Sequence, residues 1–250
     1  MSDVKNNEKG SIFLIGPMGT GKSATGRELS KIFASLKYID VDSKEVRFDF
    51  WRKHTDYSSE VDSNIRKEQG FLGQYKYWKK YEAELVNFLL RHDDNKAIVD
   101  FGAGQTVYES QYMLRQIQKA FSTKNNIFLI LPCEDREECQ RQLEERMEKR
   151  KFEGVQKRHP EKLTEEEIRT GRIRVSDDEY KLNQHFLDSI SNRSLATHII
   201  YTNGASPKEI ARTIAEVYLG MNISSDKAKV VLNKERKVHI DDKRGESYGD

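Results

Sequence analysis

The chain has 250 residues, which is enough for one domain with a sizeable core and additional segments. Charged residues make up 34% of the sequence, hydrophobic residues make up 36%, and the formal net charge is only +2. This balance argues against a dedicated nucleic-acid-binding domain, and no apolar run reaches the length of a membrane span. Cys133 and Cys139 have no other typical metal ligands at suitable spacing, so we expect free thiols. Residues 1–10 show no signal-peptide core, and we expect a cytoplasmic protein.

The first expected element is an apolar strand at 11–15, and it leads directly into a phosphate-binding motif. Residues 16–23 read Gly-Pro-Met-Gly-Thr-Gly-Lys-Ser, which fits G-x-x-x-x-G-K-S. Its glycines allow the backbone N–H groups to converge on an anion, and the helix expected from about Lys22 adds the positive end of its dipole. An ordinary glycine turn is the alternative. The motif predicts nucleotide contacts from Gly16, Met18, Gly19, Thr20, Gly21, Lys22, Ser23 and Ala24.

Four more short strands are expected further along the chain, at 37–39, 97–99, 126–131 and 198–201. They alternate with segments of helical spacing, such as 75–91, which indicates a parallel sheet covered on both faces. A last helix should open at Ser206 and Pro207, because serine is a good N-cap and proline suits the first helical position. The pattern predicts a three-layer α/β P-loop NTPase, similar to nucleoside monophosphate kinases, with a five-stranded parallel sheet.

A charged stretch at 141–188 interrupts this pattern, and arginines and glutamates dominate it. We interpret the stretch as an enlarged helical lid that closes over the nucleotide; a solvated, salt-bridged helical hairpin is the alternative. Arg146 and Arg150 lie four residues apart on one helical face, and we select Arg146 as the lid residue that reaches the phosphates. The expected kinase domain is 11–220, with a flexible N-terminus at 1–10 and a charged tail, disordered or loosely docked, at 221–250.

Three aspartates follow expected strands at the edge where α/β sheets bind ligands. Asp40 and Asp42 alternate along one strand, so we expect both side chains on the same face. Asp100 ends another strand and could hold a metal-bound water, or it could cap a tight turn. With the Ser23 hydroxyl, Asp100 forms part of the expected Mg²⁺ site.

Five fragments, at 12–29, 38–42, 78–82, 102–104 and 200–211, together resemble the shikimate kinase family of small-molecule P-loop kinases. The resemblance implies ATP- and Mg²⁺-dependent phosphoryl transfer to a hydroxyl group, with Lys22, Asp42 and Arg146 as the catalytic residues. It also implies that Asp40 belongs to the Mg²⁺ site, near the hydrated metal, that Asp42 orients or deprotonates the acceptor hydroxyl, and that Asn203 lies beside the adenine. The acceptor-binding residues that it implies are Asp42, Lys79, Glu82, Gly102, Ala103 and Gly104.

The acceptor site departs from the family pattern at three positions. Lys79 stands where the family has an arginine that grips a carboxylate, Ser176 has the spacing of a second arginine, and Ala103 replaces a glycine. We therefore expect a small-molecule acceptor other than shikimate. A nucleoside or nucleotide kinase, a nucleotide-dependent switch without transfer activity and, less well supported, a nucleic-acid end kinase are the alternatives. The sequence fits a monomer and a dimer equally.

Overall fold

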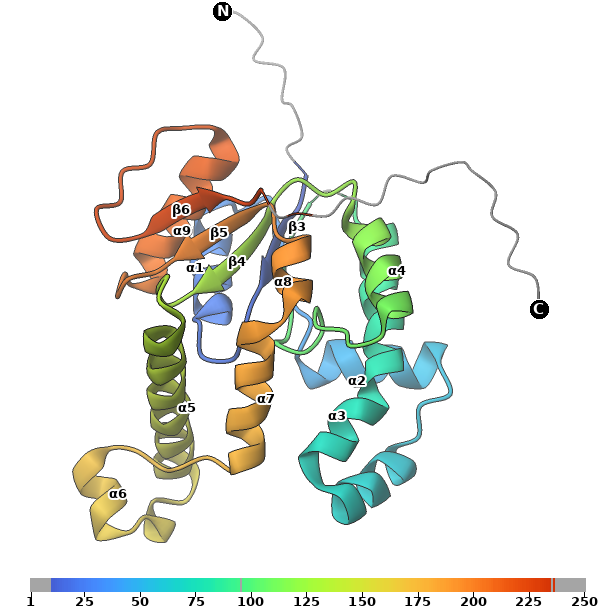
Figure 1. The fold of residues 1–250 in the computed structure, drawn as a ribbon, viewed down its shortest axis with the longest axis vertical. Coiled ribbons are helices and arrows are strands. Elements are labelled where there is room, and N and C mark those ends of the chain that lie inside the picture. Colours follow the sequence, from blue (N-terminus) through green and yellow to red (C-terminus); the bar gives the residue numbers. More distant parts are fainter. Residues whose placement is uncertain (1–9, 95, 235, 237–250) are drawn as a thin grey trace, which may run out of the picture.

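A sheet of six strands forms the centre of the fold in the residues that the structure, a computed structural model, describes: 10–94, 96–234 and 236. The strands are β1 Ile12–Ile15, β2 Lys37–Asp40, β3 Ala97–Asp100, β4 Ile127–Leu131, β5 His198–Tyr201 and β6 Lys229–Leu232. Their order is β2-β3-β1-β4-β5-β6 (Figure 1). β1 to β5 are mutually parallel, which confirms the expected parallel sheet.

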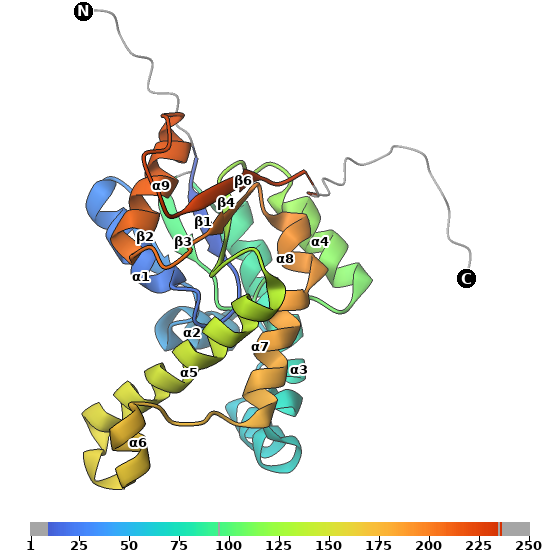
Figure 2. The same cartoon turned by 60° about the vertical axis from the view of Figure 1, so that its left-hand side comes forward.

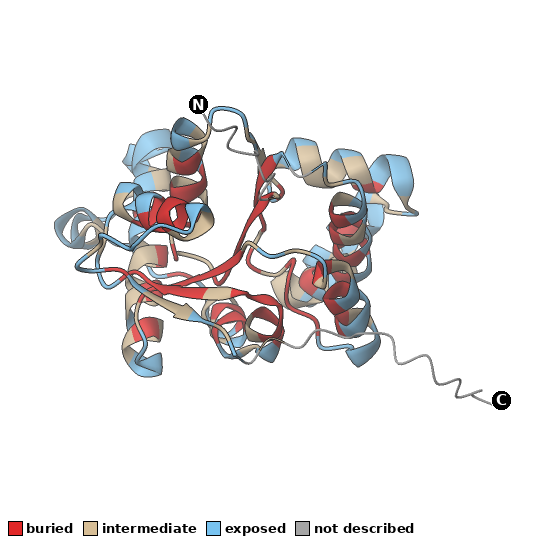
Figure 3. Ribbon diagram, turned by 90° about the horizontal axis from the view of Figure 1, so that it is seen from above, coloured by how far each residue is buried: buried red, intermediate tan, exposed pale blue. Residues whose placement is uncertain are grey.

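Helices cover both faces of this sheet. They are α1 Lys22–Ile32, α2 Lys44–His54, α3 Ser59–Arg91, α4 Gln111–Phe121, α5 Arg136–Arg158, α6 Glu165–Thr170, α7 Asp177–Asp188, α8 Ile190–Leu195 and α9 Pro207–Leu219, with a 3₁₀ turn at Pro160–Lys162. Successive strand residues face opposite sides. Ile12 and Leu14 therefore pack with α1 and α9, whereas Phe13 and Ile15 pack in the cluster that α3, α4 and α8 share. Figure 3 shows the buried strands between these two helical layers, so the three-layer fold class is confirmed.

The sixth strand was not expected, because its residues belong to the segment that the sequence marks as a charged tail. β6 pairs antiparallel with β5, from His198 opposite Leu232 to Tyr201 opposite Lys229. The pairing gives partners to backbone groups of β5 that would otherwise form an open sheet edge. The expected tail therefore contributes a strand to the sheet at 229–232. Residues 1–9, 235 and 237–250, which make up most of the expected flexible ends, lie outside the described residues.

α2 and α3 form a lobe beside the sheet. The 33-residue α3 is broken at Gly70, whose φ of 68° and ψ of −162° are accessible to glycine and strained for other residues. The part of α3 after this break contains the helix expected at 75–91. Six aromatic side chains pack between α2 and α3: Phe48, Trp51, Tyr57, Tyr77, Trp78 and Tyr81.

The segment expected to form a lid folds as α5, α6 and α7, which extend away from the sheet (Figures 1 and 2). α5 and α7 are joined by a hydrogen bond from the Tyr180 hydroxyl to the Glu148 carboxylate. Arg141 pairs with Glu138 and Glu145 on the exposed surface of α5, as the salt-bridged interpretation expects for such residues. Within the described part of the chain, no helix combines the length and the apolar character that crossing a bilayer requires.

Candidate active site

A cleft of about 810 Å³ opens at the carboxyl ends of β1, β2 and β3. α5 of the lid forms part of its wall, and so does Pro207 at the start of α9. The structure brings twelve of the predicted site residues together on its lining: Met18, Gly19, Gly21, Lys22, Ser23, Ala24, Asp40, Asp42, Asp100, Gly102, Ala103 and Arg146. The cleft therefore combines the P-loop, the acidic strand ends and the lid.

The P-loop between β1 and α1 is held by its own backbone. Gly16 has a φ of 135°, and a Cβ atom there would lie 2.7 Å from the carbonyl oxygen of Ile130, so no other residue fits without rearrangement. The Lys22 ammonium donates hydrogen bonds to the carbonyl oxygens of Gly16 (2.7 Å) and Pro17 (2.9 Å). Gly16 and Thr20 do not line the cleft, but both shape the loop. The buried Thr20 hydroxyl donates a hydrogen bond to the Pro17 carbonyl oxygen.

Lys22 is the buried cation of this cleft. Burial lowers the pKa of its ammonium, and the nearby carboxylates of Asp100 and Asp42 oppose that shift. Arg150 of α5 lines the same cleft, and its positive charge also lowers the pKa of Lys22. A polyanion in the cleft would relieve this repulsion.

Asp100 has the features of a metal-site carboxylate. Its side chain is 2% exposed; Oδ2 accepts a hydrogen bond from the Tyr38 hydroxyl (3.0 Å), and Oδ1 is buried without a hydrogen-bond partner in the described residues. Burial raises the pKa of Asp100, while Lys22 and the Ser23 hydroxyl lower it. A hard cation takes oxygen ligands of this kind, so Ser23 and Asp100 fit a Mg²⁺ ion held mainly by phosphates and water.

Asp40 and Asp42 both line the cleft, but they do not alternate along a strand as we expected. β2 ends at Asp40. The Asp40 carboxylate accepts a hydrogen bond from the Asp42 N–H (3.2 Å), and this contact stabilises the turn that leads to α2. Ser43 caps α2. Partial desolvation at the cleft wall raises the pKa of Asp42, although its side chain is still 59% exposed, and an ion pair with Arg47 (2.8 Å) opposes that shift.

Arg47 is a site residue that sequence reasoning missed. Its guanidinium lies over the rings of Phe48 (4.7 Å), Trp51 (5.4 Å) and Trp78 (4.7 Å), and it holds the Asp42 carboxylate. The aromatic residues of α2 and α3 therefore set the position of Arg47, and through it they orient Asp42 at the cleft.

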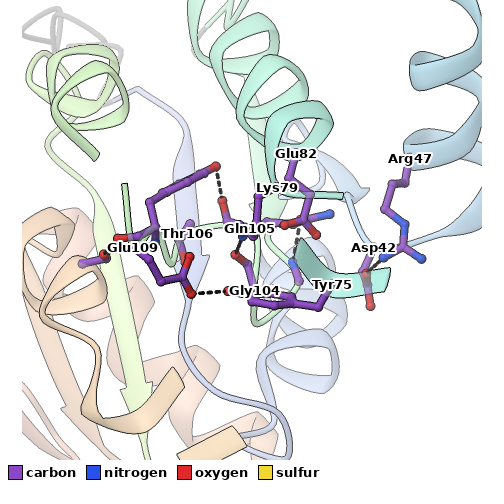
Figure 4. A network of polar contacts seen from close by, with 12 residues as sticks. Asp42, Arg47, Tyr75, Lys79, Glu82, Gly104, Gln105, Thr106 and Glu109 are labelled. Carbon is purple, nitrogen blue, oxygen red and sulfur yellow. Dashed lines mark hydrogen bonds and ion pairs between the residues drawn. The ribbon is translucent and has the colours of Figure 1, made fainter. Parts of the chain in front are cut away.

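The turn at 102–104 lies against Asp42. A Cβ atom on Gly102 would be 2.9 Å from Oδ1 of Asp42, so the glycine allows this close approach. Gln105, which is fully buried, accepts a hydrogen bond from the Gly102 N–H (2.7 Å) and donates one to the carbonyl oxygen of Val41 (3.2 Å). No motif marks Gln105, yet its amide connects the turn to the chain beside Asp42 (Figure 4).

Lys79 and Glu82 lie behind this turn and not on the cleft lining. The Lys79 ammonium is 2.6 Å from the Glu82 carboxylate and donates to the Gly104 carbonyl (Figure 4). It also lies 4.8 Å from the centre of the Tyr75 ring and 4.7 Å from the centre of the Tyr108 ring. The two side chains are only 9% and 4% exposed. Lys79 is thus engaged by the protein, and Lys79, Glu82 and Gly104 all lie outside the cleft lining, so their contact with the acceptor stays a prediction.

The lid places Arg146 and Arg150 on the cleft lining, as their spacing suggests. Arg146 donates to the carbonyl oxygen of the P-loop residue Gly19 (3.3 Å). Ser176, at the spacing of the family's second arginine, caps α7 instead. Asn203, with a φ of 47°, donates to the carbonyl oxygen of Lys227 and does not line the cleft.

The sheet order, the P-loop and the position of the cleft define the class of three-layer P-loop NTPases. Over 82 residues the chain is 37% identical to the shikimate kinase of Histophilus somni (strain 2336), and the resemblance to shikimate kinases is thereby confirmed in sequence. That match covers 33% of this chain and 39% of the relative's length. No family model matches the chain. A solved shikimate kinase from Acinetobacter baumannii, in complex with shikimate, aligns with 84% of this chain and 93% of its own, at 17% identity and a TM-score of 0.46.

Proposed function

We propose that this chain transfers the γ-phosphoryl group of Mg-ATP to a hydroxyl group of a small molecule. The observation that carries the proposal is the arrangement of one cleft, in which Lys22, Asp100 and Asp42 line the same space. Phosphoryl transfer needs mainly positioning and charge neutralisation, and these residues offer both. The sequence match to a shikimate kinase supports the same reaction class.

In this proposal the P-loop and the lid bind the nucleotide. Backbone N–H groups from Gly19 to Ser23 and the Lys22 ammonium hold the phosphates, and Arg146 and Arg150 add positive charge from α5. A bound Mg²⁺ ion would neutralise phosphate charge, and Ser23 and Asp100 would hold it directly or through water. The Oδ1 atom of Asp100, which has no hydrogen-bond partner among the described residues, supports this assignment.

We assign the acceptor to the end of the cleft near Asp42, opposite the end where the P-loop binds the nucleotide. Asp42 would accept a hydrogen bond from the reacting hydroxyl group and orient it, or remove its proton. Arg47 holds this carboxylate, and Gly102 leaves it room. We infer an acceptor that differs from shikimate, because the Lys79 ammonium is engaged by Glu82 and Gly104 and is not available to grip a carboxylate.

The first experiment is an ATP-consumption assay, combined with thermal shift, on a panel of shikimate, sugars, nucleosides and nucleotides. Stabilisation by Mg-ATP and phosphate transfer to one compound would support the proposal. The matched control is Lys22→Ala, which should abolish transfer and weaken nucleotide binding. Unchanged turnover in Lys22→Ala, or no stabilisation of the wild-type chain by Mg-ATP, would contradict the proposal.

A nucleotide kinase is the second candidate, and one observation favours it. Arg146 and Arg150 line the same cleft as Asp42, and an acceptor that carries phosphate needs additional cations. The panel separates the two candidates, because a nucleotide kinase would transfer phosphate to a nucleoside or nucleotide alone. Stabilisation by Mg-ATP without transfer to any compound would favour a nucleotide-dependent switch.

A further inference from the structure

Asn183, on α7, touches the P-loop although no sequence motif marks it. Its side chain is 3% exposed, and its Oδ1 atom accepts a hydrogen bond from the Met18 N–H (2.8 Å). Its Nδ2 atom donates to the Met18 carbonyl oxygen (3.3 Å) and lies 3.1 Å from the sulfur of Met147 on α5. Reversing this amide would set its N–H₂ group against the Met18 N–H, donor against donor, so the network fixes its orientation.

Met18 is held at its side chain as well as at its backbone. The side chain packs in an apolar cluster with Ala103 of the 102–104 turn and with Leu182 and Phe186 of α7. Leu182 and Phe186 flank Asn183 on the same buried face of that helix. One helix therefore positions both parts of a P-loop residue that lines the cleft.

The other end of the lid contacts the next residue of the loop. Arg146 of α5 donates to the carbonyl oxygen of Gly19 (3.3 Å), directly after Met18 in the chain. α5, which leads into the lid, and α7, which leads out of it, thus hydrogen-bond to consecutive P-loop residues. The Met147 contact joins the two helices at Asn183.

We propose that Asn183 is a positioning residue for nucleotide binding, which fixes the P-loop at Met18 and ties its shape to the lid. The inference rests on the proposed function, because it requires a P-loop that binds a nucleotide. Without the amide, the Met18 N–H and carbonyl lose their partners, and the loop can rotate its N–H groups away from the phosphates. Asn183 acts through the loop and needs no contact with the nucleotide.

The test measures the binding of Mg-ADP by titration calorimetry for the wild-type chain and two alanine variants. Asn183→Ala should weaken binding about tenfold, which corresponds to about 1.4 kcal/mol. The matched control is Asn192→Ala, on α8. Asn192 is similarly buried, at 2% exposed, and its amide bonds to the Thr106 hydroxyl and the backbone carbonyl of Phe186 instead of to P-loop atoms. The control should lower the melting temperature but leave Mg-ADP affinity within about twofold of wild type.

Wild-type affinity in Asn183→Ala would overturn the inference, and so would equal affinity losses in both variants, which would indicate a general structural role. If Asn183→Ala does not fold, amide hydrogen exchange of the nucleotide-free wild-type chain decides. The Met18 N–H should exchange slowly, because it donates a hydrogen bond to Asn183. A Met18 exchange rate as fast as that of an exposed amide would overturn the inference. Failure of the folded wild-type chain to bind Mg-ADP would instead count against the proposed function.

Discussion

Gly26 lies where α1 meets β2, and replacing it with alanine should destabilise the fold. A Cβ atom at this position would lie 2.5 Å from Cε2 of Tyr38, 3.2 Å from Cδ2 of the same ring and 3.3 Å from Cδ1 of Leu14. Ordinary contacts begin near 3.4 Å, so the Tyr38 ring must move by nearly 1 Å. Leu14 is fully buried and limits any adjustment of the helix.

Three contributions set the size of the effect. Overpacking of a dense core costs about 1–3 kcal/mol. Displacing Tyr38 also breaks its hydrogen bond to Asp100 (3.0 Å), which removes about 1 kcal/mol more. Alanine has a higher helix propensity than glycine, which stabilises the helix by about 1 kcal/mol and offsets part of this loss. The free energy of unfolding should fall by about 1–3 kcal/mol, which lowers the melting temperature of a domain of this size by about 2–12 °C.

Thermal unfolding of wild type, Gly26→Ala and the matched control Gly154→Ala tests this reasoning. Gly154 is also inside a helix, but a Cβ atom there meets only the mobile end of Arg158, at 3.3 Å. The control should therefore keep the gain in helix propensity and stabilise the protein by up to about 1 kcal/mol. A Gly26→Ala protein that melts at or above the wild-type temperature would refute the proposed packing of Tyr38.

Asp42→Asn should leave the dissociation constant of Mg-ATP within about threefold and lower turnover of the accepted compound at least about 100-fold; weaker Mg-ATP binding would instead assign Asp42 to the metal site. Lys79→Met should lower the free energy of unfolding by about 3–5 kcal/mol in urea titrations, because it leaves Glu82 buried without its cation. Adding Glu82→Leu to that variant should restore much of the loss, and no recovery would contradict this origin. Burial, with help from Arg236, lowers the pKa of His198, so the unfolded chain binds this proton more tightly than the folded one. Stability should therefore fall as the pH drops below about 6.5, and His198→Gln should flatten the change between pH 7.5 and 5.5.

The parts of the fold that depend on local sequence could be predicted. The P-loop follows from eight consecutive residues, and the five parallel strands follow from short apolar runs between helices. β6 could not be predicted in the same way. Its four residues are half exposed and stand in a polar segment, and their strand conformation depends on the neighbouring edge of β5.

The same distinction between local sequence and distant contacts applies to the candidate site. Asp100 ends β3 and Asp42 lies two residues after the end of β2, so their position at the cleft could be inferred from the chain alone. Lys79 has the sequence position of an acceptor-binding residue, and Tyr75 and Glu82 are its neighbours on the same helix. Its direction also depends on the Tyr108 ring and the Gly104 carbonyl, which belong to a distant segment that no motif around Lys79 contains.

The packing of α1 against α9 has a consequence for protein synthesis. The helix that follows the P-loop is covered by the last helix of the domain, through apolar contacts around Leu29 and Ile214 and an edge-to-face pair of Phe33 and Tyr218, 5.1 Å apart. Tyr218 also donates to the carbonyl oxygen of Gly10, just before β1. A nascent chain halted before residue 207 therefore carries the whole phosphate-binding motif without the layer that supports it. Affinity for a nucleotide should mark a domain whose translation is nearly complete.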